Sequence, residues 1–400
     1  MKSDLLASDG GMPVRTAEFP QWPVFGETEE RLLLETLRSG KWGGANRSKL
    51  PELEEKIAAL HGARHGLTMV NGTLSLTVAL KAAGVQPGDE VIMPSYTFIA
   101  TATSALLFGA IPVFADVEPD TLLLDPEQIE RLISPRTKAI VAVNIAGAPA
   151  DMTRLKSIAV RRGLVLIEDS AQAIGAEWDG KPVGALGDIG SISFQSSKNL
   201  TAGEGGMLLT NDDKLADAAW SLSNVGRVRG GEWYQHERIG WNLRMTEFQA
   251  AVLLGQLTRL EEQLRHRERN AELLTQLLEE IDGVGVMRRR PLQTRHAYHL
   301  YMFRLEPELA VRFDKKEAIG KINAEGIPVS GGYVPLNRNT AIVEETERWT
   351  GRKQVWDCPN SERASDKEVL WLSQRVLLAE EGDMYDVAHA VRKVVRHLQS

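Results

Sequence analysis

The sequence predicts an α/β fold whose larger part is a mostly parallel sheet of about seven strands with helices on both faces. Two observations predict it. Short apolar runs alternate with helical stretches between residues 65 and 210, and polar or glycine-rich segments follow several of these runs. In addition, 400 residues are too many for one small core and suffice for two α/β domains.

The seven expected strands are His65–Val70, Glu90–Met93, Pro112–Ala115, Ala139–Asn144, Leu164–Ile167, Ile189–Phe194 and Gly206–Thr210. Amphipathic or helical patterns separate or precede them at Thr28–Ser39, Leu50–Leu60, Thr73–Ala83 and Ile99–Phe108. The first ~25 residues are rich in proline, glycine and tryptophan, and we expect them to form an extended arm.

A long helix is expected from Met245 to about Glu280, with Thr246 as its N-cap and Gln249 completing a capping box. Beyond it we expect a strand at His299–Leu305 and helical pieces at Asp314–Ala324, Lys367–Leu372 and Met384–Gln399. The chain is therefore expected to divide into a larger domain at 1–261, which includes the arm, and a smaller α+β domain at 262–400.

Composition excludes several classes of partner. A formal net charge of −7 argues against nucleic acids and anionic membranes, which need a basic surface. The single cysteine, Cys358, permits no intrachain disulfide, and we expect a buried structural thiol rather than a nucleophile. The segment Met1–Gly11 has no apolar core, so we expect no signal peptide, no membrane span and a soluble cytoplasmic protein. We expect no metal site.

Four segments carry chemistry. The first, Asn71-Gly72-Thr73, follows a strand and opens a helix, where free backbone amides and a hydroxyl suit a phosphate. Taken alone, this segment is better explained as a turn with an N-cap.

The second segment, Glu168-Asp169-Ser170-Ala171-Gln172, places a carboxylate at the end of a buried strand, where a charge is costly unless it is paired. Asp169 can hold a proton on the ring nitrogen of a pyridine cofactor, or it can cap the next helix. Glu168 is the weaker candidate because neighbouring strand residues point to opposite sides.

The third segment contains Lys198 in a serine-rich loop that begins at Ser193 and continues to Gly203-Glu204-Gly205-Gly206. A single loop lysine is usually just a solvated charge, whereas a lysine that forms an imine must be desolvated and partly neutral. Ser193 and Ser197 can supply phosphate donors. The fourth segment, Asn242-Leu243-Arg244, lies ahead of the long helix and has no capping role.

These motifs, in this order and spacing, resemble the DegT/DnrJ/EryC1/StrS sugar aminotransferase family of fold-type I enzymes that use pyridoxal 5′-phosphate (PLP). The resemblance covers nearly the whole chain. It also includes Ser39-Gly40-Lys41-Trp42, Pro94-Ser95-Tyr96-Thr97-Phe98, Gly240-Trp241 before Asn242, and the region after Cys358-Pro359-Asn360.

The resemblance implies that Lys198 bonds to PLP and moves a proton, and that Asp169 pairs with the pyridine nitrogen. Phe98 would stack on the ring, and Gln172 would lie near its phenolic oxygen. Gly72, Thr73 and Ser193 would hold the phosphate. Asn242 would reach the cofactor of a second subunit, which implies a homodimer with shared sites. Trp42, Arg244, His299 and Tyr333 are further candidates for substrate contacts, with packing or an interface ion pair as the alternatives.

The resemblance also bears on substrate. Gln172 with Phe194–Lys198 resembles scyllo-inosose aminotransferases, while Glu18–Pro23 and Trp371–Leu378 resemble 3-amino-5-hydroxybenzoate synthases. We therefore expect transfer from L-glutamine or L-glutamate to a cyclic polyhydroxy ketone in aminocyclitol, amino-sugar or antibiotic biosynthesis. A nucleotide-linked keto-sugar and an aminating dehydration are the alternatives. A non-catalytic regulator is disfavoured because Lys198 and Asp169 are both present. The segment Asn144-Ile145-Ala146-Gly147 departs from the histidine, aromatic and glycine of many relatives, which weakens inference about the substrate.

Overall fold

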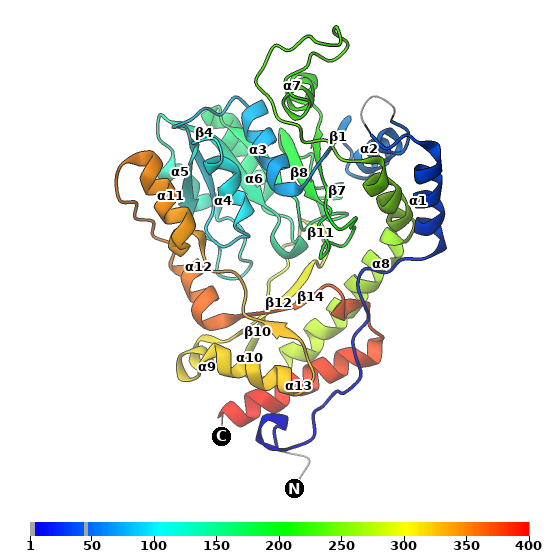
Figure 1. Cartoon of the computed structure of the whole chain (residues 1–400). Helices are drawn as coiled ribbons and strands as arrows, with labels where there is room; N and C mark the ends of the chain where they lie inside the picture. The colour runs from blue at the N-terminus through cyan, green and yellow to red at the C-terminus, as the bar shows by residue number, and fades with distance from the viewer. Residues whose placement is uncertain (1–4, 44–46, 400) are drawn as a thin grey trace.

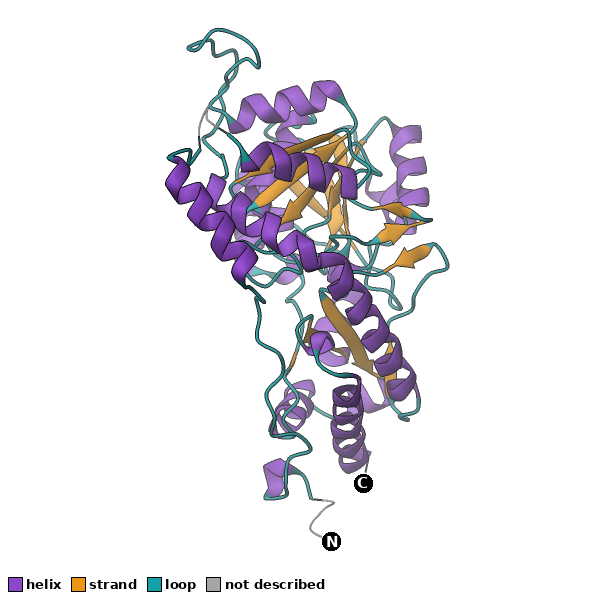
Figure 2. Cartoon of the chain, turned by 90° about the vertical axis from the view of Figure 1, so that its right-hand side faces the viewer, coloured by secondary structure: helices purple, strands orange, loops and turns teal. Residues whose placement is uncertain are grey.

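The computed structural model describes residues 5–43 and 47–399, which form a larger and a smaller lobe (Figures 1 and 2). The larger lobe is built on a seven-stranded sheet with the order β1-β9-β8-β5-β4-β2-β3. Its strands are β1 (His65–Met69), β2 (Glu90–Pro94), β3 (Ile111–Ala115), β4 (Thr137–Val143), β5 (Val165–Asp169), β8 (Ile189–Ser193) and β9 (Gly206–Thr210). All seven expected strands are present, with ends shifted by at most two residues.

The sheet is mostly parallel, as expected. β2 pairs in parallel with β3 and β4, β4 with β5, and β5 with β8, whereas β9 runs antiparallel to both β1 and β8. Strands are connected by α3 (Gly72–Ala82), α4 (Ala100–Leu106), α5 (Pro126–Leu132) and α6 (Met152–Arg162), and α7 (Asp213–Ser223) follows β9. Because parallel strands end at the same edge, the segments that follow β5 and β8 come together there.

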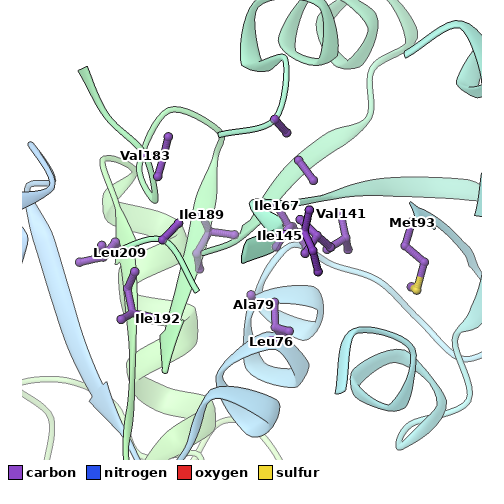
Figure 3. Close-up of a cluster of buried hydrophobic side chains, with 14 of the residues drawn as sticks. Leu76, Ala79, Met93, Val141, Ile145, Ile167, Val183, Ile189, Ile192 and Leu209 are labelled. Atoms are coloured by element: carbon purple, nitrogen blue, oxygen red, sulfur yellow. The ribbon is translucent and has the colours of Figure 1, made fainter. Parts of the chain in front are cut away.

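The core of the larger lobe lies between the sheet and its helices. Figure 3 shows apolar side chains of α3 facing those of the central strands. Burying each of these side chains contributes about 1.5–3 kcal/mol, so the sheet is the rigid part of the molecule. The labelled residues include Leu76, Ala79, Met93, Val141, Ile167, Ile189, Ile192 and Leu209, all fully or almost fully buried.

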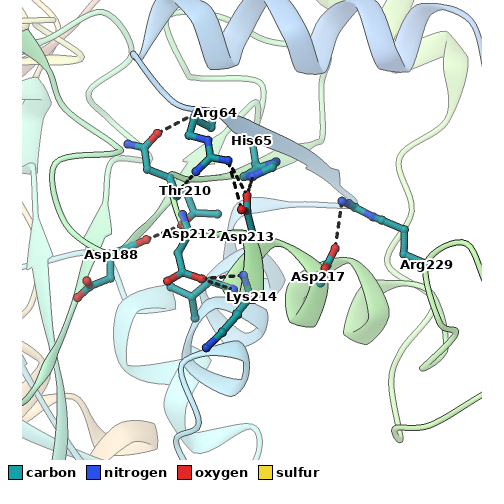
Figure 4. A network of polar contacts seen from close by, with 11 residues as sticks. Arg64, His65, Asp188, Thr210, Asp212, Asp213, Lys214, Asp217 and Arg229 are labelled. Carbon is teal, nitrogen blue, oxygen red and sulfur yellow. Dashed lines mark hydrogen bonds and ion pairs between the residues drawn. The ribbon is translucent and has the colours of Figure 1, made fainter.

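The edge of the sheet is also fastened by polar contacts near the start of α7 (Figure 4). Asp212 caps this helix by accepting hydrogen bonds from the backbone N–H groups of Lys214 and Leu215. Asp213 contacts Arg64 and His65 at the beginning of β1, at 2.9 and 2.7 Å. These contacts tie α7 to the outermost strand.

The smaller lobe contains an antiparallel sheet with the order β10-β12-β14-β13. Its strands are β10 (Val284–Val286), β12 (Leu300–Leu305), β13 (Val329–Ser330) and β14 (Val369–Ser373). Its helices are α9 (Pro307–Arg312), α10 (Lys315–Ala324) and α13 (Glu381–Gln399). The lobe is therefore α+β, as expected.

The expected helical piece at Lys367–Leu372 is wrong. Only one helical turn occurs there, at Ala364–Glu368, and the chain then forms the central strand β14. Leu370 and Leu372 pack into the core of the smaller lobe, while Val369 and Trp371 pack into that of the larger lobe. A strand that is apolar on both faces shows no alternation in sequence, and this is why its period could not be recognised.

Three further helices cover one side of the molecule: α1 (Glu27–Ser39), α2 (Lys49–Leu60) and the long α8 (Glu247–Glu279). α8 begins with the expected capping box of Thr246 and Gln249. It runs from the larger lobe into the smaller one (Figure 1) and contributes Leu264 to the first core and Ala271 to the second. The two cores are therefore joined by one continuous helix.

Some elements were not expected from the sequence. They are the helices α5, α6, α7, α9, α11 (Thr340–Thr350) and α12 (Pro359–Arg363), the short strands β10 and β13, and the small sheet of β6 (Glu177–Trp178), β7 (Lys181–Pro182) and β11 (Gln293–Arg295). Within the described ranges, no helix is both long enough and apolar enough to cross a bilayer.

The N-terminal arm packs along the smaller lobe, where both chain ends lie in Figures 1 and 2. Leu6 and Phe19 are buried in the core of that lobe. Arg15 forms ion pairs with Asp383 and Asp386 at the start of α13. The arm thus connects the smaller lobe to α1 of the larger one.

Candidate active site

A cavity of about 560 Å³ lies where α3 begins and where β5 and β8 end, and residues of the smaller lobe complete its wall. Most of the site residues expected from the sequence line it. They are Gly72, Thr73, Phe98, Asp169, Gln172, Ser193, Lys198, His299 and Tyr333.

Lys198 lies in the turn after β8, where its backbone N–H donates to the carbonyl of Gln195 at 2.9 Å. Its amine makes no hydrogen bond within the described part of the chain. Loss of solvation lowers the pKa of Lys198 to about 8, and the nearby Asp169 carboxylate offsets this only in part. A partly neutral amine that faces a cavity can act as a nucleophile toward a carbonyl group. The solvated loop charge is therefore not what the structure shows.

Asp169 is the last residue of β5 and is buried. Its carboxylate accepts hydrogen bonds from the hydroxyl of Thr101 at 2.8 Å and from the N–H of Ala171 at 3.3 Å. Burial raises the pKa of Asp169 despite these bonds and the nearby Lys198. The carboxyl group does not cap a helix, and its environment suits a cationic partner in the cavity.

Glu168 points to the other side of the strand, as expected, and has a different role. Its carboxylate accepts three backbone N–H bonds of 2.6–2.7 Å, from Gly184, Leu186 and Gly187. Glu168 therefore holds the loop before β8 in place, while Asp169 faces the cavity.

The opposite end of the cavity is formed by the N-terminus of α3. Asn71 is the N-cap and accepts a hydrogen bond from the N–H of Leu74 at 2.9 Å. A Cβ on Gly72 would lie 2.8 Å from the Cβ of Ser193, so only glycine allows α3 to approach β8 this closely. Both the cap and a phosphate cradle are therefore compatible with this segment, since the first residues of α3 line the cavity together with Ser193.

Gln172 links the cavity to the segment that departs from many relatives. Its Oε1 accepts the backbone N–H of Ala146 at 2.7 Å, and its Nε2 donates to the hydroxyl of Tyr333 at 2.9 Å. Because a backbone N–H can only donate, the orientation of the Gln172 amide is fixed. The Tyr333 oxygen must then accept, and its own proton is free to point into the cavity. Phe98 lies beside Tyr333, with 5.9 Å between ring centroids.

Three expected residues lie outside this cavity in the single chain. Trp42 is half exposed, packs against Phe248 and donates its indole N–H to the carbonyl of Leu37. Arg244 lines a separate cavity of about 270 Å³. Asn242 is exposed and forms a bridge with Asn224.

Some residues at or beside the cavity could not be singled out from the sequence. Thr101 belongs to α4 and carries no motif, yet its hydroxyl fixes Asp169. Gln195 and Glu204 lay within recognised motifs and also line the cavity. Among the described residues, no group of three or more histidine, cysteine or acidic side chains is arranged to hold a metal ion.

Comparison with known proteins decides the family. Residues 23–392 match the model of the DegT/DnrJ/EryC1/StrS aminotransferase family. The chain belongs to this family. It is therefore a PLP-dependent aminotransferase, as the motifs predicted.

Its relatives match over their full length. The chain is 39% identical to a putative L-glutamine:3-amino-2,3-dideoxy-scyllo-inosose aminotransferase of Streptoalloteichus tenebrarius, over 99% of both chains. It is 36% identical to a 3-amino-5-hydroxybenzoate synthase of Amycolatopsis mediterranei, over 95% of this chain and 98% of that one. A crystal structure of a 3-amino-5-hydroxybenzoic acid synthase superposes with a TM-score of 0.88 at 35% identity, covering 96% of this chain and all of that one.

The residues present fit PLP. The cavity combines an amine without a hydrogen-bond partner, a buried carboxyl group with a raised pKa, and the start of a helix with two hydroxyl groups. The amine matches the aldehyde of PLP, the carboxyl group matches its protonated pyridine nitrogen, and the start of the helix with the hydroxyl groups matches its phosphate. When bound, PLP supplies an electron-withdrawing ring that stabilises negative charge at the α-carbon of an amino donor.

The two neighbouring acids allow a matched test. We expect Asp169→Asn to lower the transamination rate by about 100-fold or more, because an amide cannot hold a proton on the pyridine nitrogen. We expect Glu168→Gln to leave the rate near normal but to lower the free energy of unfolding by about 1–3 kcal/mol, because the new amide group faces backbone donors.

The measurements are the steady-state rate and the denaturant midpoint of both variants beside the wild type. Equal rates for Asp169→Asn and wild type would show that another group holds the ring proton.

Proposed function

We propose that this aminotransferase moves an amino group from L-glutamine, or from L-glutamate, to an uncharged cyclic polyhydroxy ketone such as a scyllo-inosose. The names of its relatives support this acceptor class, since several curated relatives at 36–39% identity are L-glutamine:scyllo-inosose aminotransferases. The expected setting is aminocyclitol or antibiotic biosynthesis.

In this proposal Lys198 and Asp169 are the catalytic residues. The Lys198 amine would hold PLP and would move a proton at the α-carbon of the donor. Asp169 keeps the proton on the pyridine nitrogen. The N–H groups at Gly72 and Thr73, with the hydroxyls of Thr73 and Ser193, hold the phosphate.

The remaining lining residues orient the ring. Phe98 would stack on the ring, and Gln172 would lie near its phenolic oxygen. His299 and Tyr333 are left on the substrate side of the cavity.

One observation carries the choice of acceptor. Apart from Lys198, no cationic side chain of the described residues lines the cavity. His299, Tyr333, Gln195 and Ser197 offer uncharged hydrogen-bonding groups instead. A nucleotide-linked sugar carries two phosphate charges that would need cations, whereas a neutral polyol needs donors and acceptors. The lining therefore supports the uncharged ketone over the nucleotide-linked alternative.

We also propose a homodimer in which Asn242 reaches the cofactor phosphate of the partner. Asn242 is exposed. It follows the loop of residues 225–241, which projects beyond α7 at the top of Figure 1. Apolar side chains on this loop are strongly exposed: Trp233 by 80%, Tyr234 by 75% and Ile239 by 96%. Such a patch is typical of a protein interface. Arg244 follows Asn242 and would lie near the same interface.

A cytoplasmic location is part of the proposal. It rests on the absence of a disulfide framework, since the buried thiol of Cys358 belongs to the only cysteine of the sequence.

A panel of acceptors tests the function. With L-glutamine as donor, we expect turnover of 2-deoxy-scyllo-inosose or 3-amino-2,3-dideoxy-scyllo-inosose, detected as the amino product by mass spectrometry. We expect none with a TDP-linked keto-sugar, because the described residues of one chain contribute no cation besides Lys198 to the cavity wall for its diphosphate. Lys198→Ala is the control. Turnover of the TDP-sugar alone would overturn the proposed acceptor class. A dehydrated aromatic product would instead favour the second candidate, an aminating dehydration like that of the similar 3-amino-5-hydroxybenzoate synthase.

Mixed dimers test the shared site. Lys198→Ala and Asn242→Ala are each expected to be nearly inactive. When the two variants are co-expressed with different tags, mixed dimers contain one site with an intact lysine and an intact partner asparagine. We expect random mixing to restore about a quarter of the wild-type rate, since half of the dimers are mixed and each has one complete site. No restoration in purified mixed dimers would mean that Asn242 serves its own chain.

A further inference from the structure

A hydrogen-bonded chain leads from the lysine loop to the substrate side of the cavity. Asn199 follows Lys198 directly, and its side chain is buried. Its Nδ2 donates to the backbone carbonyl of Ala297 at 2.6 Å. A carbonyl can only accept, so the amide nitrogen of Asn199 must face Ala297 and the amide oxygen must face the other way. The orientation of this amide is therefore determined by its partner.

The oxygen of Asn199 faces the ring of His299. Its Oδ1 lies 3.4 Å from the Nδ1 of that imidazole. An amide oxygen can only accept, so Nδ1 must carry the proton. In a neutral ring the lone pair is then on Nε2, the nitrogen that Asn199 does not contact.

The surroundings of His299 favour the neutral ring. The side chain is buried, and the charged groups that act on it are the cations Lys198 and Arg267. Burial lowers the pKa of His299 well below 6.5, and both cations lower it further. The ring is therefore uncharged around neutral pH.

The backbone around His299 is held firmly. The N–H of Ala297 donates to the carbonyl of Gly147 at 3.0 Å, and the N–H of Gln374 donates to the carbonyl of His299 at 3.1 Å. Tyr298, between them, has a φ of 47°, a conformation that costs free energy for a residue with a side chain. Strain of this kind persists only where the surrounding contacts determine the conformation, so the backbone that carries His299 is held by its neighbours.

We propose that Asn199 is a positioning residue that holds His299 with Nδ1 protonated, so that Nε2 presents a fixed hydrogen-bond acceptor to a hydroxyl group of the amino acceptor. The hydroxyl of Tyr333, whose oxygen accepts from Gln172, is the complementary donor on the same cavity wall. The contact of these groups to a polyhydroxy ketone rests on the proposed function. The protonation state of His299 does not depend on that function.

The arrangement suits hydroxyl compounds. A hydroxyl group both donates and accepts, so the hydroxyl groups of a polyol can donate to Nε2 of His299 and accept from the hydroxyl of Tyr333.

Nitrogen NMR of the imidazole rings tests the protonation state directly, with no substrate present. The holoenzyme is labelled with ¹⁵N-histidine, and His299 is assigned by loss of its signals in His299→Asn. We expect a neutral ring with the proton on Nδ1 in the wild type. In Asn199→Ala we expect the ring to become a mixture of its two neutral tautomers, or to carry its proton on Nε2. Asn323→Ala is the matched control, because Asn323 also bonds backbone groups of a nearby strand but lies in the smaller lobe.

Two results would overturn the proposal. One is a wild-type ring with its proton on Nε2, and the other is an Nδ1–H ring that is unchanged in Asn199→Ala. If Asn199→Ala does not fold, the wild-type spectrum still decides the first point, and Asn199→Ser supplies a less disruptive variant for the second.

Kinetics then tests the contact to the acceptor. Glutamine can place an amide oxygen near the position of Nε2, whereas asparagine reaches only the position of Nδ1. With 2-deoxy-scyllo-inosose we expect His299→Asn to raise KM by about tenfold relative to His299→Gln, the loss of one hydrogen bond. The rate of cofactor conversion by L-glutamine alone should be similar in both. Equal KM values for the ketone would overturn the contact while leaving the aminotransferase assignment intact.

Discussion

The desolvation of Lys198 and Asp169, which line the same cavity, is the constraint on which the rest of the site depends. Removing two opposite charges from water is costly, and neither group makes enough hydrogen bonds to offset that cost. The pKa of Lys198 falls to about 8 and that of Asp169 rises, because each is desolvated. The strands β5 and β8, held by a fully packed core, maintain this unfavourable arrangement. A bound cofactor with a cationic ring nitrogen and an aldehyde would relieve both groups.

The place of each residue in the fold also determines its role in the rest of the site. Two successive acids of β5 serve opposite faces, one holding a loop and the other facing the cavity. The smaller lobe contributes His299 at the start of β12, so the cavity is complete only when both lobes are in place. The continuous helix α8 and the N-terminal arm join the lobes on one side of the molecule. Fold and site are thus coupled through a few elements that extend across both cores.

Much of the fold could be predicted because local pattern and tertiary structure agree. The seven strands of the larger sheet and the long helix α8 have clear boundaries in sequence. β14 was missed because it is apolar on both faces, and β11 with β6 because strands of two or three residues carry no period. Of the site, Lys198 and the other motif residues that line the cavity could be expected. The roles of Thr101, Ala146 and Asn199 could not, since each depends on a contact with a residue between 26 and 100 positions away.

One measurement tests the central claim most directly: mixing the holoenzyme with L-glutamine in the absence of any ketone. If Lys198 holds PLP and Asp169 supports the ring, the visible absorbance of the lysine-bound cofactor should disappear in a single turnover. A near-ultraviolet band should replace it, with about one equivalent of keto acid released per subunit. Lys198→Ala should show no such conversion. A holoenzyme whose spectrum stays unchanged with both L-glutamine and L-glutamate would contradict the account, because the site would then bind the cofactor without transferring an amino group.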